Sequence, residues 1–293
     1  MTKQAQSGNP LDLIRQAGLI HRADQLIPLF HPTIAATTQQ VEFEREIPLG
    51  ASKLGGRPDM PPELEWPSYQ DRPLEFIAQI DLTETAPYDE NGLLPKAGRL
   101  LCFYDVQQWI EGKPFDEGRF RVYYDASDTA DVQRIDYPET AEAEFRPCAL
   151  TFSSVLTLPP LESKPLMADM ELYDYQSDTP EREAEIDAYL NLLKMTSRSS
   201  PQHQVLGWPY PIQGDVFIEA VRAGLGIPMS QPINDVYQTY GTQIDEWQLL
   251  LQIDSDDKAN MLWGDAGVLY WCIRREDLRH RRFDRVIVTM QCS

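Results

Sequence analysis

Basic residues, histidines and cysteines are scarce in this sequence of 293 residues. Lysine and arginine number 26 against 46 aspartates and glutamates, which gives a formal net charge of −20. Binding to nucleic acid or to an anionic membrane needs a positive surface, so this balance argues against both partners. A basic or neutral protein is the partner that such a charge favours.

Long apolar runs are also absent. No stretch of about 18 apolar residues occurs, so we expect no membrane span. Residues 1–10 are polar and lack the apolar core of a secretory signal, and we therefore expect a cytoplasmic protein. The cysteines are scattered without a C-x-x-C pair, which predicts free thiols and not disulfides or zinc ligands: Cys102, Cys148, Cys272 and Cys292.

Catalytic motifs are missing as well. Neither the G-x-S-x-G nucleophile turn nor a glycine-rich phosphate loop is present. A catalytic Ser or Cys needs a partnered base, and of the four histidines only His203 lies in a loop that resembles a site. We therefore expect no catalytic residue and no cofactor, and the sequence favours a protein that is not an enzyme.

One segment, residues 254–265, partly fits a calcium loop. Asp254, Asp256 and Asp265 stand at ligand positions of such a loop. However, Lys258 occupies another ligand position, and Ala259 stands where the sharp turn requires glycine. We therefore expect no metal site.

The most informative feature is a repeated strand-like stretch. Residues 74–81 and 247–254 alternate with a period of two, which is typical of a strand with one apolar and one mixed face. The apolar faces are predicted to be Leu74, Phe76, Ala78 and Ile80 in the first copy and Trp247, Leu249, Leu251 and Ile253 in the second. Gln79 and Gln252 are then equivalent, and we expect both to be buried and hydrogen-bonded.

The similarity extends beyond these strands. Residues 97–104 resemble 266–273, residues 119–124 resemble 283–290, and the loop at 54–58 resembles that at 206–209. Such self-similarity predicts an α+β fold with an internal duplication, in which mostly antiparallel β units pack together with flanking helices.

Three segments follow from this pattern. Residues 1–40 are predicted as an N-terminal helical arm, with Asn9 as a helix cap. Residues 41–160 form the first repeat half and open with a predicted edge strand at 41–47. Residues 161–293 hold a helical insert and the second half, with helices capped by Thr179 and Asp215.

Polar residues of the repeats make a candidate ligand site in the groove between the halves. The candidates are Gln79, Asp81, Gln252 and Asp254 on the strands, with His203, Trp208, Gln213 and Asp265 on nearby loops. Asp81 and Asp254 fit two interpretations: an acid–base pair across a pseudo-twofold axis, or caps of separate strand-end turns.

Together these motifs resemble the YwqG-like family of bacterial proteins, a domain of unknown function. The resemblance rests on Leu54-Gly-Gly-Arg-Pro58, Trp66-Pro67, Ala78-Gln-Ile-Asp81, Leu206-Gly-Trp-Pro209, Leu250-Leu-Gln-Ile-Asp254, Trp263-Gly-Asp-Ala-Gly267 and residues 283–292. It implies a duplicated α+β fold and supplies no catalytic residues. Members are often encoded near toxin and immunity genes, which implies a protective binding role.

Two functions are therefore expected as alternatives. The first is an interaction protein that binds a partner, such as a toxin, without catalysis. The second is a small-ligand-binding protein or hydrolase-type enzyme with its site between the two halves.

Overall fold

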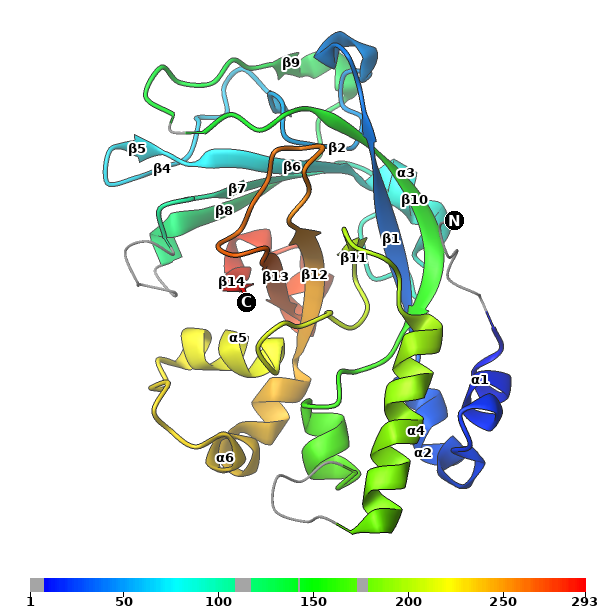
Figure 1. The fold of residues 1–293 in the computed structure, drawn as a ribbon. Coiled ribbons are helices and arrows are strands. Elements are labelled where there is room, and N and C mark those ends of the chain that lie inside the picture. Colours follow the sequence, from blue (N-terminus) through cyan, green and yellow to red (C-terminus); the bar gives the residue numbers. More distant parts are fainter. Residues whose placement is uncertain (1–7, 109–116, 142, 173–178) are drawn as a thin grey trace.

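A ten-stranded antiparallel sheet forms the centre of the computed structural model, which describes residues 8–108, 117–141, 143–172 and 179–293 (Figure 1). Its strand order is β14-β13-β12-β11-β1-β10-β2-β6-β7-β8. The strands are β1 (His31–Gln40), β2 (Lys53–Leu54), β6 (Glu75–Asp81), β7 (Arg99–Tyr104), β8 (Phe120–Asp125), β10 (Cys148–Thr157), β11 (His203–Val205), β12 (Trp247–Asp254), β13 (Val268–Arg274) and β14 (Ile287–Gln291). The chain is thus α+β, as the sequence predicts.

Helices and two small two-stranded sheets surround this sheet. The helices are α1 (Pro10–Gln16), α2 (Ala23–Leu26), α3 (Leu82–Thr85), α4 (Pro180–Thr196), α5 (Val216–Leu225), α6 (Ile233–Asp245) and α7 (Arg275–Arg279). One small sheet pairs β3 (Asp59–Met60) with β9 (Gln133–Arg134), and the other is a hairpin of β4 (Ser68–Tyr69) and β5 (Arg72–Pro73). The caps predicted at Asn9, Thr179 and Asp215 are confirmed, because each side chain accepts a backbone N–H of the first helical turn.

The sheet has two flanks with matching registers. We call β2, β6, β7 and β8 the first flank, and β11, β12, β13 and β14 the second; β1 and β10 lie between them. Lys53 pairs with Gln79 in the first flank, as Gln204 pairs with Gln252 in the second. Each flank carries a register shift at the same point of its long strand, one residue before Ala78 and one before Leu251.

This register shift corrects the predicted strand faces. Leu74 and Phe76 contact an outer cluster, whereas Ala78 and Ile80 contact the central core, so these four residues do not share a face. The second flank divides in the same way. A bulge inserts one residue and reverses the alternation, and both faces of each strand are therefore buried.

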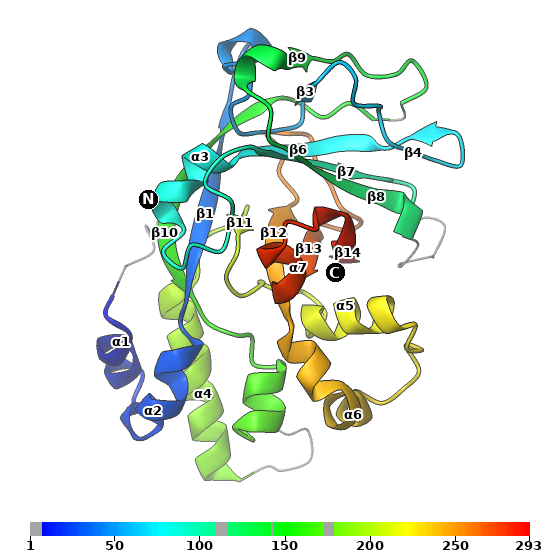
Figure 2. The ribbon, with the colours of Figure 1, turned by 180° about the vertical axis from the view of Figure 1, so that it is seen from behind.

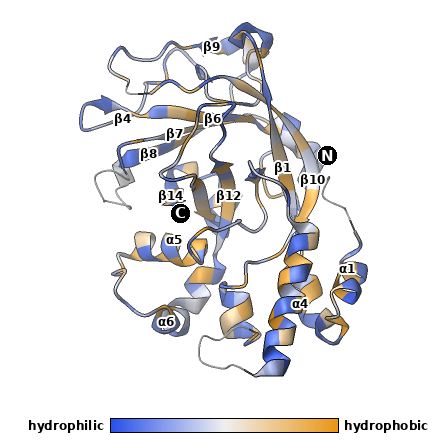
Figure 3. Ribbon diagram, in the orientation of Figure 1, coloured by the Kyte–Doolittle hydropathy of each residue, from blue (hydrophilic) through white to orange (hydrophobic). Residues whose placement is uncertain are grey.

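One apolar core joins the two flanks. It combines residues of the first flank, such as Leu54 and Leu100, with residues of the second, such as Leu250 and Trp271. Figure 3 shows the apolar colour concentrated on the sheet strands and on α5. Both flanks therefore contribute side chains to one core.

Different layers cover the outer faces (Figures 1 and 2). Helices α5 and α6 pack on the second flank, and the loops around β3, β4 and β9 pack on the first. The N-terminal helices pack on α4. Within the described ranges, no helix has the length and apolarity required to cross a bilayer.

Three predicted segments differ from the structure. Residues 31–40, assigned to the helical arm, form β1 in the middle of the sheet. The strand predicted at 41–47 is wrong, since this segment is a loop with a 3₁₀ turn at Glu44–Glu46. The last strand begins at Ile287, because Phe283–Arg285 forms a 3₁₀ turn, η8. Alternating polar residues fit a surface turn as well as an edge strand, so periodicity alone misassigned them.

Candidate functional site

A pocket of about 430 Å³ lies beside the second flank, at the start of β12. Its walls come from the start of β1, the loop at 206–208, the end of α6 and helix α7. The loop at 91–93, which connects α3 to β7 of the first flank, completes the lining. The site therefore depends on segments that are far apart in the sequence.

An aromatic pair forms one wall. His31 stacks on Trp208 with their ring centroids 4.8 Å apart and an interplanar angle of 22°. The indole Nε1 donates to the Leu29 carbonyl oxygen at 2.8 Å, and the Trp208 backbone N–H donates to Thr157 Oγ1 at 2.8 Å. These two bonds hold the indole in place between His31, on which it stacks, and the Phe217 ring at 5.8 Å, and the indole lines the pocket from this position.

Gly207 allows the chain to reach this wall. Its φ is +77°, and a Cβ atom there would lie 1.7 Å from Thr33 Oγ1. A larger residue is therefore excluded both by conformation and by space. The loop at 206–208 can therefore lie against Thr33 of β1 only because this position is glycine.

Positive side chains line the pocket in a protein that is acidic overall. Arg275 and Arg279 are both exposed, and neither side chain has an ion-pair or hydrogen-bond partner within the described part of the chain. Lys164 differs, because it lies 3.0 Å from both Asp169 and Asp245. The two guanidinium groups are therefore free to bind an anion.

Two other titratable side chains line the pocket: His31 is uncharged, and Asp215 caps a helix. Burial, together with the charge of Arg275, lowers the pKa of His31 to about 4, so the imidazole is uncharged at neutral pH. Asp215 caps α5 by accepting the Phe217 N–H at 2.9 Å, and burial raises its pKa. A histidine with so low a pKa is a weak general base.

Only one predicted site residue, Trp208, lines this pocket. Gln79 and Gln252 are fully buried, as expected, and each amide bridges backbone groups of the loop beside it. Gln79 accepts the Asp59 N–H at 2.9 Å and donates to the Ala51 carbonyl at 2.8 Å. Gln252 accepts the Tyr210 N–H at 2.9 Å and donates to the Gln202 carbonyl at 2.7 Å.

The candidate acids occupy separate turns. Asp81 caps α3 and accepts the Thr83 N–H at 2.9 Å, whereas Asp254 accepts the Gln202 N–H at 2.7 Å. Asp81 therefore fits the capping interpretation, whereas Asp254 binds the backbone of a segment distant in the sequence and does not cap its own strand-end turn. Asp265 and Gln213 are exposed: Asp265 offers its backbone carbonyl to Ser293, and Gln213 donates its backbone N–H to Gln291.

His203 is fully buried and has both ring nitrogens engaged. Nδ1 accepts the Asp254 N–H at 3.2 Å, and Nε2 lies 3.1 Å from Asp256 Oδ2. Thr38 Oγ1 donates to the same carboxylate oxygen at 2.6 Å. With no ring nitrogen left for a substrate, this His–Asp pair holds β11 to the turn after β12 and has a structural role.

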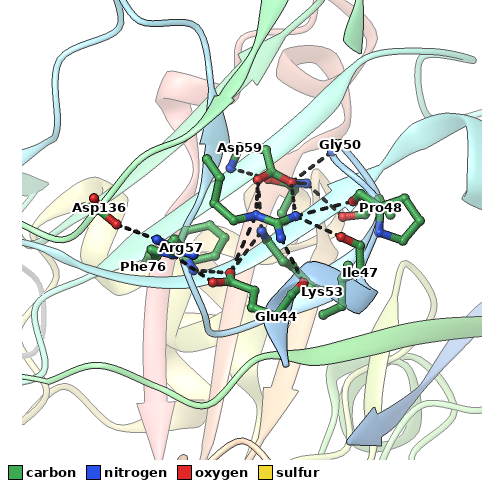
Figure 4. A network of polar contacts seen from close by, with 12 residues as sticks. Glu44, Ile47, Pro48, Gly50, Lys53, Arg57, Asp59, Phe76 and Asp136 are labelled. Atoms are coloured by element: carbon green, nitrogen blue, oxygen red, sulfur yellow. Dashed lines mark hydrogen bonds and ion pairs between the residues drawn. The ribbon is translucent and has the colours of Figure 1, made fainter. Parts of the chain in front are cut away.

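A buried charge cluster was missed by the sequence analysis (Figure 4). Lys53 Nζ lies 3.2 Å from Asp59 Oδ1 and 3.5 Å from Glu44 Oε1, and Arg134 Nε donates to Asp59 Oδ1 at 2.7 Å. Burial lowers the pKa of Lys53. Burial alone would raise the pKa of Asp59, but the bond from Arg134 and the charge of Lys53 lower it.

Perturbed charges of this kind also occur at active sites. Here the Lys53 and Asp59 side chains are fully buried, and every charge has a partner of opposite sign. The cluster therefore fastens the loop at 50–59 to β9. No local sequence pattern predicts this cluster, because its four charged residues are not adjacent in the sequence.

Comparison with known proteins places the chain in a family of unknown function. Residues 52–292 match the family described as Domain of unknown function (DUF1963). No curated protein matches the chain significantly.

Proposed function

Since the chain belongs to the DUF1963 family, whose description assigns no activity, we propose from the pocket itself that the protein binds a small organic anion with a flat apolar body. The observation that carries the proposal is the pairing of an aromatic wall at Trp208 with the unpartnered guanidinium groups of Arg275 and Arg279. Ligand pockets are typically apolar cavities of about 300–1,000 Å³ with a few convergent polar groups, and this pocket fits that description.

The residues that line the pocket support binding of a ligand and not its chemical conversion. The described residues of the lining include no serine, threonine, cysteine or tyrosine, and Lys164 is held between two aspartates. A nucleophile with a matched base is what a hydrolase would need. The hydrolase alternative therefore has less support than a binding role.

Titration calorimetry tests the proposal with defined probes. Benzoate and phenyl phosphate serve as anions, with benzyl alcohol and benzylamine as a neutral and a cationic control of similar shape. We expect heat of binding for the anions only. Arg275→Gln is expected to weaken the anions about tenfold, since a charge-assisted hydrogen bond contributes about 1.5–3 kcal/mol.

The matched control is Arg15→Gln, because Arg15 is an exposed arginine on α1 that pairs only with Asp12. It is expected to bind the anions as the parent does. Equal binding of anion and cation, or unchanged binding in Arg275→Gln, would contradict the proposal.

A duplicated origin of the two flanks, within the YwqG-like branch, is part of this proposal. It is supported by the matching registers of Gln79 and Gln252 and by the equivalent positions of the two bulges. The backbone is also left-handed at corresponding residues, Gly55 with φ +58° and Leu206 with φ +60°. We further expect a cytoplasmic location, because the four cysteines are free, as a reducing compartment favours.

A basic protein partner, such as a toxin, is the second candidate function. The net charge of −20 and the exposed acids Glu181, Glu183 and Asp187 on α4 favour it. Affinity capture from the native host at low and high salt tests it. A specific protein that is retained at low salt and released at high salt would support this role, and recovery of none would oppose it.

A further inference from the structure

A second cavity lies at the seam where the curled sheet fails to close. It has a volume of about 590 Å³ and lies between β8 and the segment 282–287, which contains η8 and the start of β14. Figures 1 and 2 show β8 and β14 on the same side of the molecule, and β8 contacts η8. The two terminal strands of the sheet thus form opposite walls of one groove, which we call the seam groove.

Both walls have strand edges. Among the described residues, β8 pairs with β7 alone and β14 pairs with β13 alone. The outer edge of a terminal strand has main-chain N–H and C=O groups that can bind another extended chain. A peptide backbone therefore matches this groove better than a compact ion does.

The groove is positively charged in an acidic protein. Its lining includes Arg121, Arg274, Arg282 and Arg285 against two aspartates, Asp277 and Asp284. Arg282 is paired with Asp277 at 2.8 Å. Neither Arg121 nor Arg274 has a carboxylate partner in the part of the chain that the structure describes, and Arg274 lies over the Trp247 ring, 5.3 Å from its centroid.

The floor of the groove has buried apolar side chains among its more extensive polar surface. Phe120, Val122 and Phe283 are buried and line it, together with the half-buried Ile287. Along an extended peptide, alternate side chains point to opposite sides. A segment with alternating acidic and apolar residues would therefore place its apolar side chains on this floor and its carboxylates near the arginines.

We propose that the seam groove binds an extended acidic segment of a partner protein, which adds as a strand along the edge of β8 between Arg121 and Arg285. The proposal is independent of the pocket beside Trp208. The overall charge of −20 repels a long polyanion such as nucleic acid, whereas a short segment interacts mainly with the nearby arginines. Since β8 has six residues, a hexapeptide matches its length.

The test uses fluorescence anisotropy with three labelled hexapeptides that alternate valine with aspartate, asparagine or lysine. We expect the aspartate peptide to bind more tightly than the other two. Arg121→Glu reverses one exposed charge on the rim and is expected to weaken it about tenfold. The melting temperature of this variant verifies that it remains folded.

Three further measurements identify the mode of binding. An aspartate peptide with N-methyl groups on alternate residues should lose affinity, because it cannot donate to a strand edge. Arg275→Gln in the other pocket and Arg15→Gln on α1 should leave the peptide affinity unchanged. Equal binding of the three peptides, full binding of the N-methylated peptide, or an equal loss in Arg275→Gln and Arg121→Glu would each overturn the proposal.

Discussion

The first and second flanks of the sheet have matching strand registers but different outer coverings. Beside Gln79, the first flank places the ionic cluster of Lys53 and Asp59 under irregular loops. Beside Gln252, the second flank places the uncharged Gln204, under the helices α5 and α6. Strand pairing fixes the register within a sheet, whereas the covering layer has only to exclude water. The ligand pocket occurs where the helical covering leaves an opening.

The largest expected effect separates the two flanks at equivalent positions. Lys53→Met removes the cation between Asp59 and Glu44, and we expect it to destabilise the fold by about 3 kcal/mol, the lower end of the cost of breaking a buried ion pair, because Arg134 and Arg57 still contact the two carboxylates. Gln204→Met removes only neutral and charge-assisted hydrogen bonds, and about 1–3 kcal/mol is expected. Urea unfolding monitored by tryptophan fluorescence measures both. If both variants lose the same free energy of unfolding, the ionic cluster is no more important for stability than the neutral contacts of Gln204.

A pH effect near neutrality is expected from α5, the helix that packs on the second flank. Burial raises the pKa of Glu219 to about 7, although Gln291 donates a hydrogen bond to it at 2.9 Å. Because the folded state holds this proton more tightly than the unfolded state, its stabilising contribution is complete below pH 4.5 and is lost as pH rises through 7. Comparing Glu219→Gln with the parent by urea unfolding should reveal a change on the order of 2 kcal/mol over that window.

His31 provides the opposite sign in the same range. Its pKa is depressed to about 4, so the unfolded state holds the proton more tightly and the contribution to stability rises between pH 4 and about 6.5. Measuring Glu219→Gln and His31→Gln side by side separates the two contributions. Identical pH profiles of parent and both variants would argue against either burial effect.

The buried amides should behave alike in the two flanks. Gln79→Leu and Gln252→Leu each leave loop backbone groups without their partner, and each is expected to destabilise by about 1–3 kcal/mol. The control is Gln213→Leu, since this side chain is exposed, and a change within about 0.5 kcal/mol is expected. A large difference in stability loss between Gln79→Leu and Gln252→Leu would show that the two amides are not equivalent.

The smallest effect concerns the N-terminal helices, which lie outside both flanks. Arg22 donates to both carboxylate oxygens of Glu185, at 3.0 and 2.9 Å, and this pair lowers the Glu185 pKa to about 2. Glu185→Gln should weaken the docking of α1 and α2 by about 0.5–1 kcal/mol at neutral pH. The contribution is present above about pH 4.3 and is lost as pH falls through 2. Hydrogen exchange of residues 10–30 measures it, and unchanged protection at neutral pH would contradict the prediction.

Local chemistry was readable from the sequence. Asn9, Thr179 and Asp215 each precede a helix that they cap, because a cap depends on the next three residues only. The burial of Gln79 and Gln252 was also predictable, since each lies between apolar neighbours on a strand. The α+β class and the shared core follow from the same alternation and its recurrence.

Long-range contacts decided the remainder. The bulges that direct Leu74 and Ile80 to different cores depend on pairing with β7, which no window of the sequence contains. Likewise, β1 is a strand because β10 and β11 flank it. The pocket and the Lys53 cluster assemble from several segments that are not continuous in the sequence, such as 31–32, 91–93 and 206–208 for the pocket and Asp59 and Arg134 for the cluster. The sequence by itself determined the local turns, caps and alternation, whereas only tertiary packing decided which polar groups meet, because burial and charge pairing are properties of the assembled surfaces.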